Sequence, residues 1–336
     1  MGENIKLAKQ NFSKLGGSFV LGTFVIFAVQ LLPSGIIQQV KPEWMQNGNF
    51  ALIITLVPMY VIGMPFLIWL LKRLPASAPE YHRMSAGQFG VAAIICYALM
   101  YCSNIIGNII TFIVGLLKGG MVENTILNIA VSHNMLLTFI YMVILAPVFE
   151  EYIFRKLIVD RAVRYGQGVA VVLSGLMFGL FHGNLNQFAY AFVLGMFWAF
   201  LYVKTGNIKI TIALHMIFNF IGGILGVLIL KLLPLNEMAE ASSSGDLAAV
   251  MEIFQSHMGA WIFYMLYMIV ILTVVITGII LLIVFRKRFK LTEENTDLQE
   301  EDIIPKGRRF KTVILNPGML AYCVFWLSMI VLQLFM

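Results

Sequence analysis

The chain has 336 residues, of which 60% are hydrophobic and only 12% charged, and it carries a formal net charge of +6. A soluble domain is about 45–50% apolar and ~25% charged, so this composition excludes a soluble globular protein and indicates a multi-pass membrane protein. The apolar runs are continuous rather than alternating, which predicts membrane helices in a lipid bilayer and not a β-barrel. Because the basic residues cluster at the ends of apolar runs, we interpret them as topology signals, and we expect no nucleic-acid partner.

Nine apolar segments follow one another along the chain, and a helix needs roughly 20 such residues to cross a bilayer. The fifth and sixth segments are short, and the polar stretch 182–187 lies between them. Such a stretch is tolerated at membrane depth only where it lines a protein cavity. Since either end segment could be re-entrant, we predict an all-α, polytopic membrane helix bundle of about eight to nine transmembrane helices. The predicted spans are 17–37, 50–71, 89–117, 135–159, 169–181, 188–203, 208–233, 261–285 and 319–336.

The basic residues divide unequally between the two sides of the membrane. If the N-terminus lies in the cytosol, the cytosolic segments hold every Lys and Arg except Lys41, Lys118 and Lys231. Cytosolic loops carry an excess of Lys and Arg, so we expect a multi-pass protein of the cell membrane with its N-terminus in the cytosol.

The same features divide the chain into four parts. We expect N-terminal transmembrane helices in 1–134, a core in 135–233 that carries the buried charges, an acidic external loop in 234–260, and C-terminal transmembrane helices in 261–336 with a charged cytosolic linker at 286–311. The spacing of the three cysteines matches no metal or redox motif, so we interpret them as apolar filler. They are Cys96, Cys102 and Cys323.

The most unusual stretch is 147–155, where two adjacent glutamates and an arginine lie inside an apolar run. An ionisable side chain in a membrane span costs at least ~2.5–3.5 kcal/mol, and it normally faces the bundle interior or a water-filled cavity. On a helix, Glu151 and Arg155 stand at i and i+4 in the order that favours an ion pair. Glu150 is turned about 100° away. We predict that Glu151 is held by Arg155 while Glu150 stays available for chemistry; a purely structural ion-pair cluster is the alternative.

Two histidines and an asparagine could join Glu150. His215 and Asn219 stand four residues apart in the seventh span, so they share one helix face. The fourth and fifth spans turn near Gly166, and Glu150 and His182 each lie 16 residues from that turn. An antiparallel hairpin therefore places them at a similar depth, and His215 reaches the same level if its helix is tilted.

Such a group fits the hydrolysis of a peptide bond, which needs a base for water, an acid for the leaving amine and donors for the oxyanion. Glu150 can be the base, His182 can share the water and shuttle the proton, and His215 with Asn219 can donate to the oxyanion. No Ser or Cys stands at a matching place, so a covalent nucleophile is not favoured.

A zinc ion held by Glu150, His182 and His215, with water as its fourth ligand, is the alternative. There is no His-Glu-x-x-His helix, and no carboxylate is obviously free to act as the base once Glu150 is a ligand. We therefore favour metal-independent catalysis with no cofactor.

Three short patterns occur in one order, each on a predicted membrane helix: Glu150-Glu-x-x-x-Arg155, Phe178-x-x-x-His182 and His215-x-x-x-Asn219. Together they resemble the motifs of the CAAX-prenyl-protease and bacteriocin-processing family, also called the CPBP or Abi family of intramembrane proteases. The resemblance covers roughly 135–230 and implies an α-helical membrane endopeptidase. It implies that Glu150 and His182 activate water and that His215 and Asn219 bind the oxyanion. The supporting residues would be Glu151, Arg155 and Phe178.

The expected function is therefore an intramembrane endopeptidase that acts on a membrane-tethered protein or hydrophobic peptide, of the CAAX type or the bacteriocin or pheromone type. One alternative is a non-catalytic membrane immunity or scaffold protein that sequesters a peptide or a membrane partner. Another is a proton-coupled transporter with a Glu–His relay, although no repeat with paired broken helices is visible. The substrate, the scissile bond and the oligomeric state are not determined by the sequence.

Overall fold

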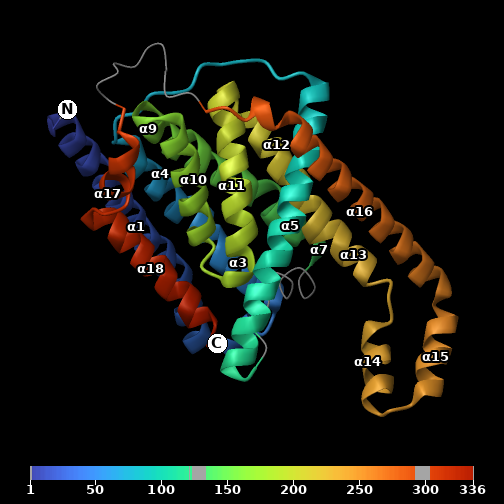
Figure 1. Ribbon diagram of the computed structural model, residues 1–336. Coiled ribbons are helices and arrows are strands. Elements are labelled where there is room, and N and C mark those ends of the chain that lie inside the picture. The colour runs from blue at the N-terminus through green and yellow to red at the C-terminus, as the bar shows by residue number, and fades with distance from the viewer. Residues whose placement is uncertain (1, 121, 123–133, 292–302, 336) are drawn as a thin grey trace.

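The computed structural model describes residues 2–120, 122, 134–291 and 303–335, and within them every regular element is a helix (Figure 1). The predicted all-α membrane bundle is confirmed. Among these residues, seven continuous helical runs are long and apolar enough to cross a bilayer, and a pair bent by 70° near the C-terminus would make an eighth. His133 and residues 292–302 of the charged linker lie outside the described residues.

The N-terminal part supplies three spans. The first is one helix of 39 residues, longer than the predicted 17–37, because the polar N-terminal segment is helical as well. The second bends through a π-helical turn, and the third begins with a capping box formed by Ser85 and Gln88. The elements are α1 (Gly2–Val40), the short α2 (Pro42–Met45), the run α3 (Gly48–Pro58), η1 (Met59–Gly63) and α4 (Met64–Lys72), and α5 (Ala86–Lys118).

The core part contains four helical segments, and one of them is too short to cross. Its α10 has 15 residues, about 22 Å of helix at 1.5 Å per residue, against a hydrocarbon thickness of about 30 Å. The fifth predicted span is therefore too short to cross the bilayer by itself. The elements are the run α7 (Met135–Thr138), η2 (Phe139–Leu145), α8 (Ala146–Glu151), η3 (Tyr152–Val159), α9 (Asp160–Ala162) and η4 (Val163–Tyr165), then α10 (Gln167–Phe181), α11 (Leu185–Thr205), and the run α12 (Ile208–Asn219), η5 (Phe220–Leu225) and α13 (Gly226–Leu230).

The C-terminal part differs from the prediction at the acidic loop. This segment forms two short exposed helices, which Figure 1 shows projecting beyond the bundle. The second of them is capped by Asp246, whose side chain accepts a hydrogen bond from the Ala249 N–H. The elements are α14 (Leu235–Ser243), α15 (Leu247–Ser256), α16 (Met258–Phe285), η6 (Arg286–Arg288), η8 (Lys306–Arg308), α17 (Arg309–Val313) and α18 (Pro317–Gln333).

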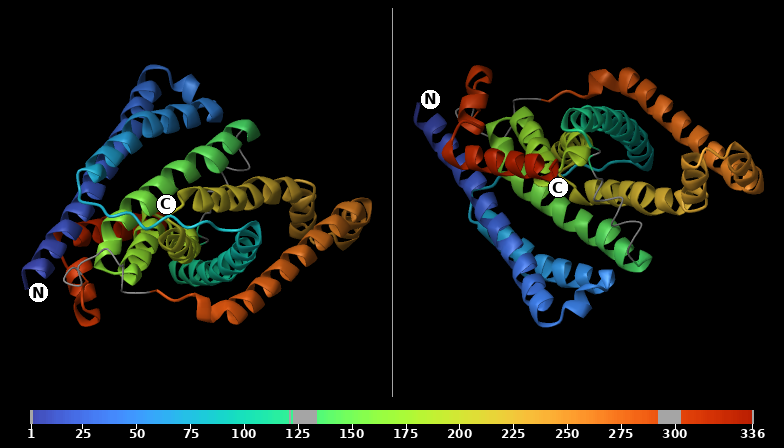
Figure 2. Two further views of the ribbon diagram at one scale, coloured as in Figure 1. Left: turned by 90° about the horizontal axis from the view of Figure 1, so that it is seen from above. Right: turned by 90° about the horizontal axis from the view of Figure 1, so that it is seen from below.

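The core helices lie in the middle of the bundle. Figure 2 shows α1, α3 and α4 on one side and α5 with α16 on the other. Within the core, α10 packs along α11, and α11 packs along α5. A Cβ atom on Gly195 of α11 would lie only 2.9 Å from the Cα of Gly175 in α10. The small residues let these two backbones approach closely, as is common between membrane helices, and this contact places the end of α10 against the rest of the core.

Candidate active site

The two adjacent glutamates lie on α8, between the π-helical turns η2 and η3. π-Helical turns inside α-helices are often found at functional sites, because they change the direction in which the following side chains point. Here the residues on either side of α8 belong to one continuous run, so the change of direction is built into a single membrane-crossing segment.

Glu151 and Arg155 form the ion pair that their spacing predicts. Arg155 Nε lies 3.0 Å from Glu151 Oε2, and both side chains are completely buried. The guanidinium also lies over the rings of Phe178, at 4.4 Å, and Trp198, at 5.2 Å. Within the described part of the chain its two terminal nitrogens have no hydrogen-bond partner. The charge of Arg155 is therefore balanced by Glu151 and by aromatic faces.

Removing one partner of this pair should destabilise the protein strongly. A buried charge left alone costs about 3–5 kcal/mol, so we expect Arg155→Met to lower the free energy of unfolding by roughly 3 kcal/mol. Denaturation in detergent, followed by tryptophan fluorescence, measures this change. The matched control is Lys41→Met, which breaks an exposed pair with Glu43 at 3.9 Å and should cost less than about 1 kcal/mol. Equal stability of the two variants would contradict the prediction.

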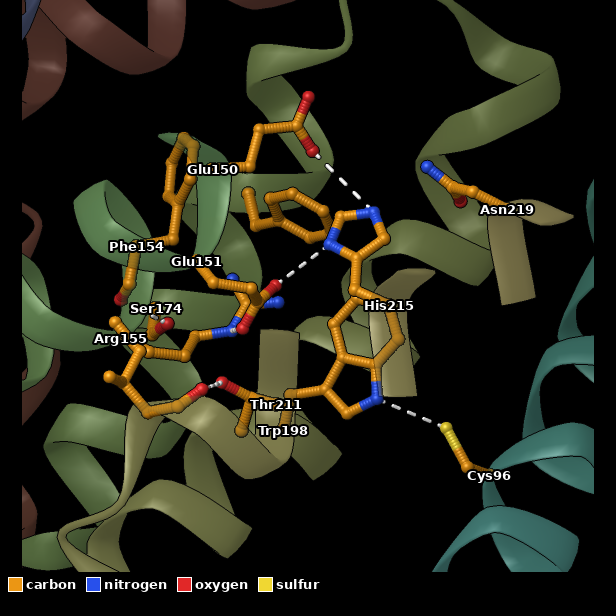
Figure 3. A network of polar contacts seen from close by, with 12 residues as sticks. Cys96, Glu150, Glu151, Phe154, Arg155, Ser174, Trp198, Thr211, His215 and Asn219 are labelled. Atoms are coloured by element: carbon orange, nitrogen blue, oxygen red, sulfur yellow. Dashed lines mark hydrogen bonds and ion pairs between the residues drawn. The ribbon is translucent and has the colours of Figure 1, made fainter. Parts of the chain in front are cut away.

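His215 stands between the two carboxylates. Its Nδ1 lies 2.9 Å from Glu151 Oε1, and its Nε2 lies 3.7 Å from Glu150 Oε2 (Figure 3). An ionised carboxylate can only accept, so Nδ1 carries a hydrogen and donates it to Glu151. This bond turns the opposite ring nitrogen toward Glu150. Glu151 is completely buried, whereas the side chain of Glu150 keeps 19% of its surface exposed.

His182 follows directly after α10. Its Nδ1 lies 2.8 Å from the Phe178 carbonyl oxygen, which can only accept, so Nδ1–H donates, and Nε2 has no hydrogen bond to the residues that the structure describes. The Phe178 ring meets His182 edge to face at 4.7 Å and His215 at 5.9 Å. His182 lies close enough to Glu150 to interact with its charge, but the two form no direct bond. The imidazole that directly neighbours Glu150 is therefore that of His215.

Asn219 lies one turn after His215, as its spacing predicts, on the last turn of α12. Its Nδ2 donates to the Met142 carbonyl oxygen in η2 over 2.8 Å. Figure 3 shows the amide on the same side of the imidazole as Glu150. The amide nitrogen carries two hydrogens, so one fastens α12 to η2 and the other is left for a further acceptor.

Several contacts of the site could not be found from the sequence patterns. Trp198 packs on His215 with ring centroids 4.5 Å apart, and its Nε1–H donates to the Sγ of Cys96 over 3.1 Å. Cys96, which we interpreted as filler, is therefore buried beneath the site as an acceptor. Three tyrosines on three different helices, Tyr60, Tyr141 and Tyr190, also lie in the neighbourhood of Glu150.

The zinc alternative stays a prediction. Among the described residues, no group of three or more His, Cys, Asp and Glu side chains is arranged to hold a metal ion. Of its proposed ligands, His182 and His215 both have Nδ1 engaged by the protein, and His215 Nε2 faces Glu150.

Comparison with known proteins places these residues within a family match. Residues 132–221 match a family model described as type II CAAX prenyl endopeptidase Rce1-like, and the matched range contains all the predicted site residues. The chain is also 28% identical, over 149 residues, to the Bacillus subtilis (strain 168) protein named "Putative membrane peptidase YdiL". That alignment covers 44% of this chain and 58% of the relative. No solved structure matches significantly.

Proposed function

We propose that this chain, whose core carries the sequence pattern of the CPBP/Abi family of intramembrane proteases, is an endopeptidase that hydrolyses a peptide bond within the membrane. The family model and the relative support a membrane protease in general. The proposed substrate is a membrane-tethered protein or a hydrophobic peptide, of the CAAX type or the bacteriocin or pheromone type. The reaction uses water activated by Glu150 together with His182.

The observation that supports this proposal most directly is that two adjacent carboxylates have different hydrogen-bond and ion-pair partners. Glu151 is tied to Arg155 and to His215 Nδ1, whereas Glu150 makes no hydrogen bond to the described residues and pairs among them only with His215 Nε2, at 3.7 Å. Adjacent acids in different surroundings can take different tasks. Glu151 orients the imidazole, and Glu150 is left to exchange a proton.

The residues account for each step of hydrolysis. Glu150 takes a proton from a water molecule, whose oxygen attacks the carbonyl carbon of the scissile bond. His182 Nε2 holds that water. The oxyanion accepts hydrogen bonds from Asn219 and from His215, whose ring Glu151 orients through Nδ1. Glu150 then gives its proton to the leaving nitrogen, the C–N bond breaks, and a carboxylic acid and an amine are released, with the second proton of the water on the acid.

We place the end of the bundle that holds the N-terminus on the cytosolic side of the membrane. Figure 1 shows the N-terminus, the linker 73–85 and η6 at one end of the bundle. These segments carry most of their charge as Lys and Arg, which favours the cytosolic side. The N-terminus would therefore lie in the cytosol, and a tethered substrate would enter from that face.

A comparison of peptides from whole membranes tests the function without a known substrate. Cells that express the wild-type chain are compared with cells that express Glu150→Ala at the same level. We expect fragments that are present only with the wild type, all ending at new cleavage sites. Identical peptide profiles, with the phenotype of the protein preserved, would contradict the proposal and favour the non-catalytic immunity or scaffold protein.

Removal of metal ions should leave activity intact. The proposed reaction activates water through Glu150 and His182 and assigns no step to a metal ion. We expect dialysis against 1,10-phenanthroline to change cleavage by less than about twofold, well below the effect of losing an acid–base group. Loss of activity that returns when zinc is added would replace this mechanism with the zinc alternative.

A further inference from the structure

The last membrane helix, α18, lies outside the residues that match the family, yet it reaches the end of α10 that carries His182. α18 packs closely on α1 where the small residues Gly318 and Ser13 meet. A Cβ atom on Gly318 would collide with the Ser13 carbonyl oxygen, and the Gly318 N–H donates to Ser13 Oγ over 3.0 Å. Such a close crossing leaves little freedom for the helix to slide or rotate.

From this crossing, α18 presents two aromatic side chains to α10. Tyr322 is completely buried, and its hydroxyl donates to the Met177 carbonyl oxygen over 2.6 Å. Met177 lies one residue before Phe178, whose carbonyl accepts from His182 Nδ1. The hydroxyl of Tyr322 therefore holds the backbone of the last turn of α10. The Phe178 carbonyl of that turn accepts the hydrogen bond from His182.

Trp326 covers the other side of the same turn. Its ring lies 5.0 Å from that of Phe181, and a Cβ atom on Gly183 would lie 3.1 Å from the indole. Gly183 also has a φ of 65°, which L side chains rarely adopt. The residues on both sides of His182 are thus packed against α18, while His182 Nε2 has no hydrogen bond to the described part of the chain.

We propose that α18 is a positioning element of the catalytic site, in which Tyr322 and Trp326 hold the last turn of α10 and thereby set the direction of His182 Nε2. This inference rests on the proposed function. A substitution far from the reacting atoms can slow an enzyme by up to ~100-fold if it misplaces a catalytic group by about 1 Å. A helix about 140 residues after His182 in the chain would therefore control the rate of the reaction.

The test uses Tyr322→Phe, which keeps the ring and removes the hydroxyl. We expect kcat to fall roughly tenfold with KM changed less than about twofold, because the geometry of the reaction changes and the binding of substrate does not. The matched control is Tyr165→Phe. Its hydroxyl is buried and accepts a hydrogen bond from Asn11 Nδ2 over 2.8 Å, away from the site. This control should keep kcat within about twofold.

A double variant separates positioning from a general loss of packing. In a His182→Asn background, Tyr322→Phe should cause no further loss of kcat, because the group that it positions is already absent. A further tenfold loss in that background would overturn the proposal, as would unchanged kcat in the single variant. If Tyr322→Phe fails to fold, Trp326→Phe, which keeps a ring against Phe181, takes its place under the same criteria.

A readout without cleavage keeps this inference separate from the proposed function. With ¹⁵N-labelled histidine, the ring signals of His182 are identified by their loss in His182→Asn. We expect them to shift in Tyr322→Phe and not in Tyr165→Phe. If no variant cleaves any peptide but this shift is seen, the protease proposal fails and the structural role of α18 stands. If cleavage is found and the signals do not move, α18 has no positioning role.

Discussion

Glu150→Gln is expected to abolish peptide cleavage, with at least a ~10³-fold loss of kcat/KM, because an amide cannot take a proton from water. The substitution preserves the shape of the side chain. Among the described residues Glu150 makes no hydrogen bond, and its ion-pair partner is His215 Nε2 at 3.7 Å, so the fold should tolerate the change. The measurement is cleavage by purified protein, together with its melting temperature.

Two further variants serve as controls for the effect of Glu150→Gln. Glu252→Gln changes an exposed glutamate of α15 in the same way, and it should leave cleavage unchanged. Glu151→Gln should also reduce cleavage, but through His215, which loses the acceptor for Nδ1–H. If Glu150→Gln keeps more than about a tenth of the wild-type activity, far more than the loss of a general base allows, Glu150 is not the base.

The second large effect is expected at His182, where two replacements separate the ring nitrogens. In His182→Asn, the amide can still donate to the Phe178 carbonyl, as Nδ1–H does now, but nothing replaces Nε2. We expect a loss of about 10²–10⁴-fold in kcat, the usual contribution of an acid–base group. In His182→Gln, the amide reaches the position of Nε2, and it can hold water but cannot transfer a proton.

A comparison of the two variants assigns the role of Nε2. A higher rate for Gln than for Asn indicates that Nε2 positions the water, and equal losses indicate proton transfer. The control is His257→Asn, because His257 Nδ1 also meets the carbonyl oxygen four residues earlier, that of Ile253, at 3.1 Å at the end of α15. Wild-type activity in His182→Asn would remove this histidine from the mechanism.

The local parts of the site could be predicted because they follow from helix spacing. The i, i+4 spacing predicts the ion pair of Glu151 with Arg155, and the same spacing predicts that Asn219 lies one helical turn after His215. The short fifth span was visible as a short apolar run before His182. These features depend on neighbours in the chain, so no knowledge of the packing was required.

Contacts between distant segments could not be predicted in the same way. Counting residues from the turn at Gly166 predicts only that Glu150 and His182 lie at a similar depth. It does not predict that His215 Nε2 lies 3.7 Å from Glu150, because the run between Glu150 and the turn contains the π-helical turn η3, where side chains no longer follow the α-helical period. Likewise, no pattern indicated that Trp198 lies on His215 or that α18 meets α10, because both depend on how helices cross.

The most direct test of the central claim uses purified protein in lipid nanodiscs with a tethered peptide found in the membrane comparison. Wild type, Glu150→Gln and Glu252→Gln are incubated with this peptide in the presence of a chelator, and the products are identified by mass spectrometry. The account predicts one new C-terminus and one new N-terminus with wild type and Glu252→Gln, and neither with Glu150→Gln. Cleavage by Glu150→Gln at the wild-type rate would contradict it.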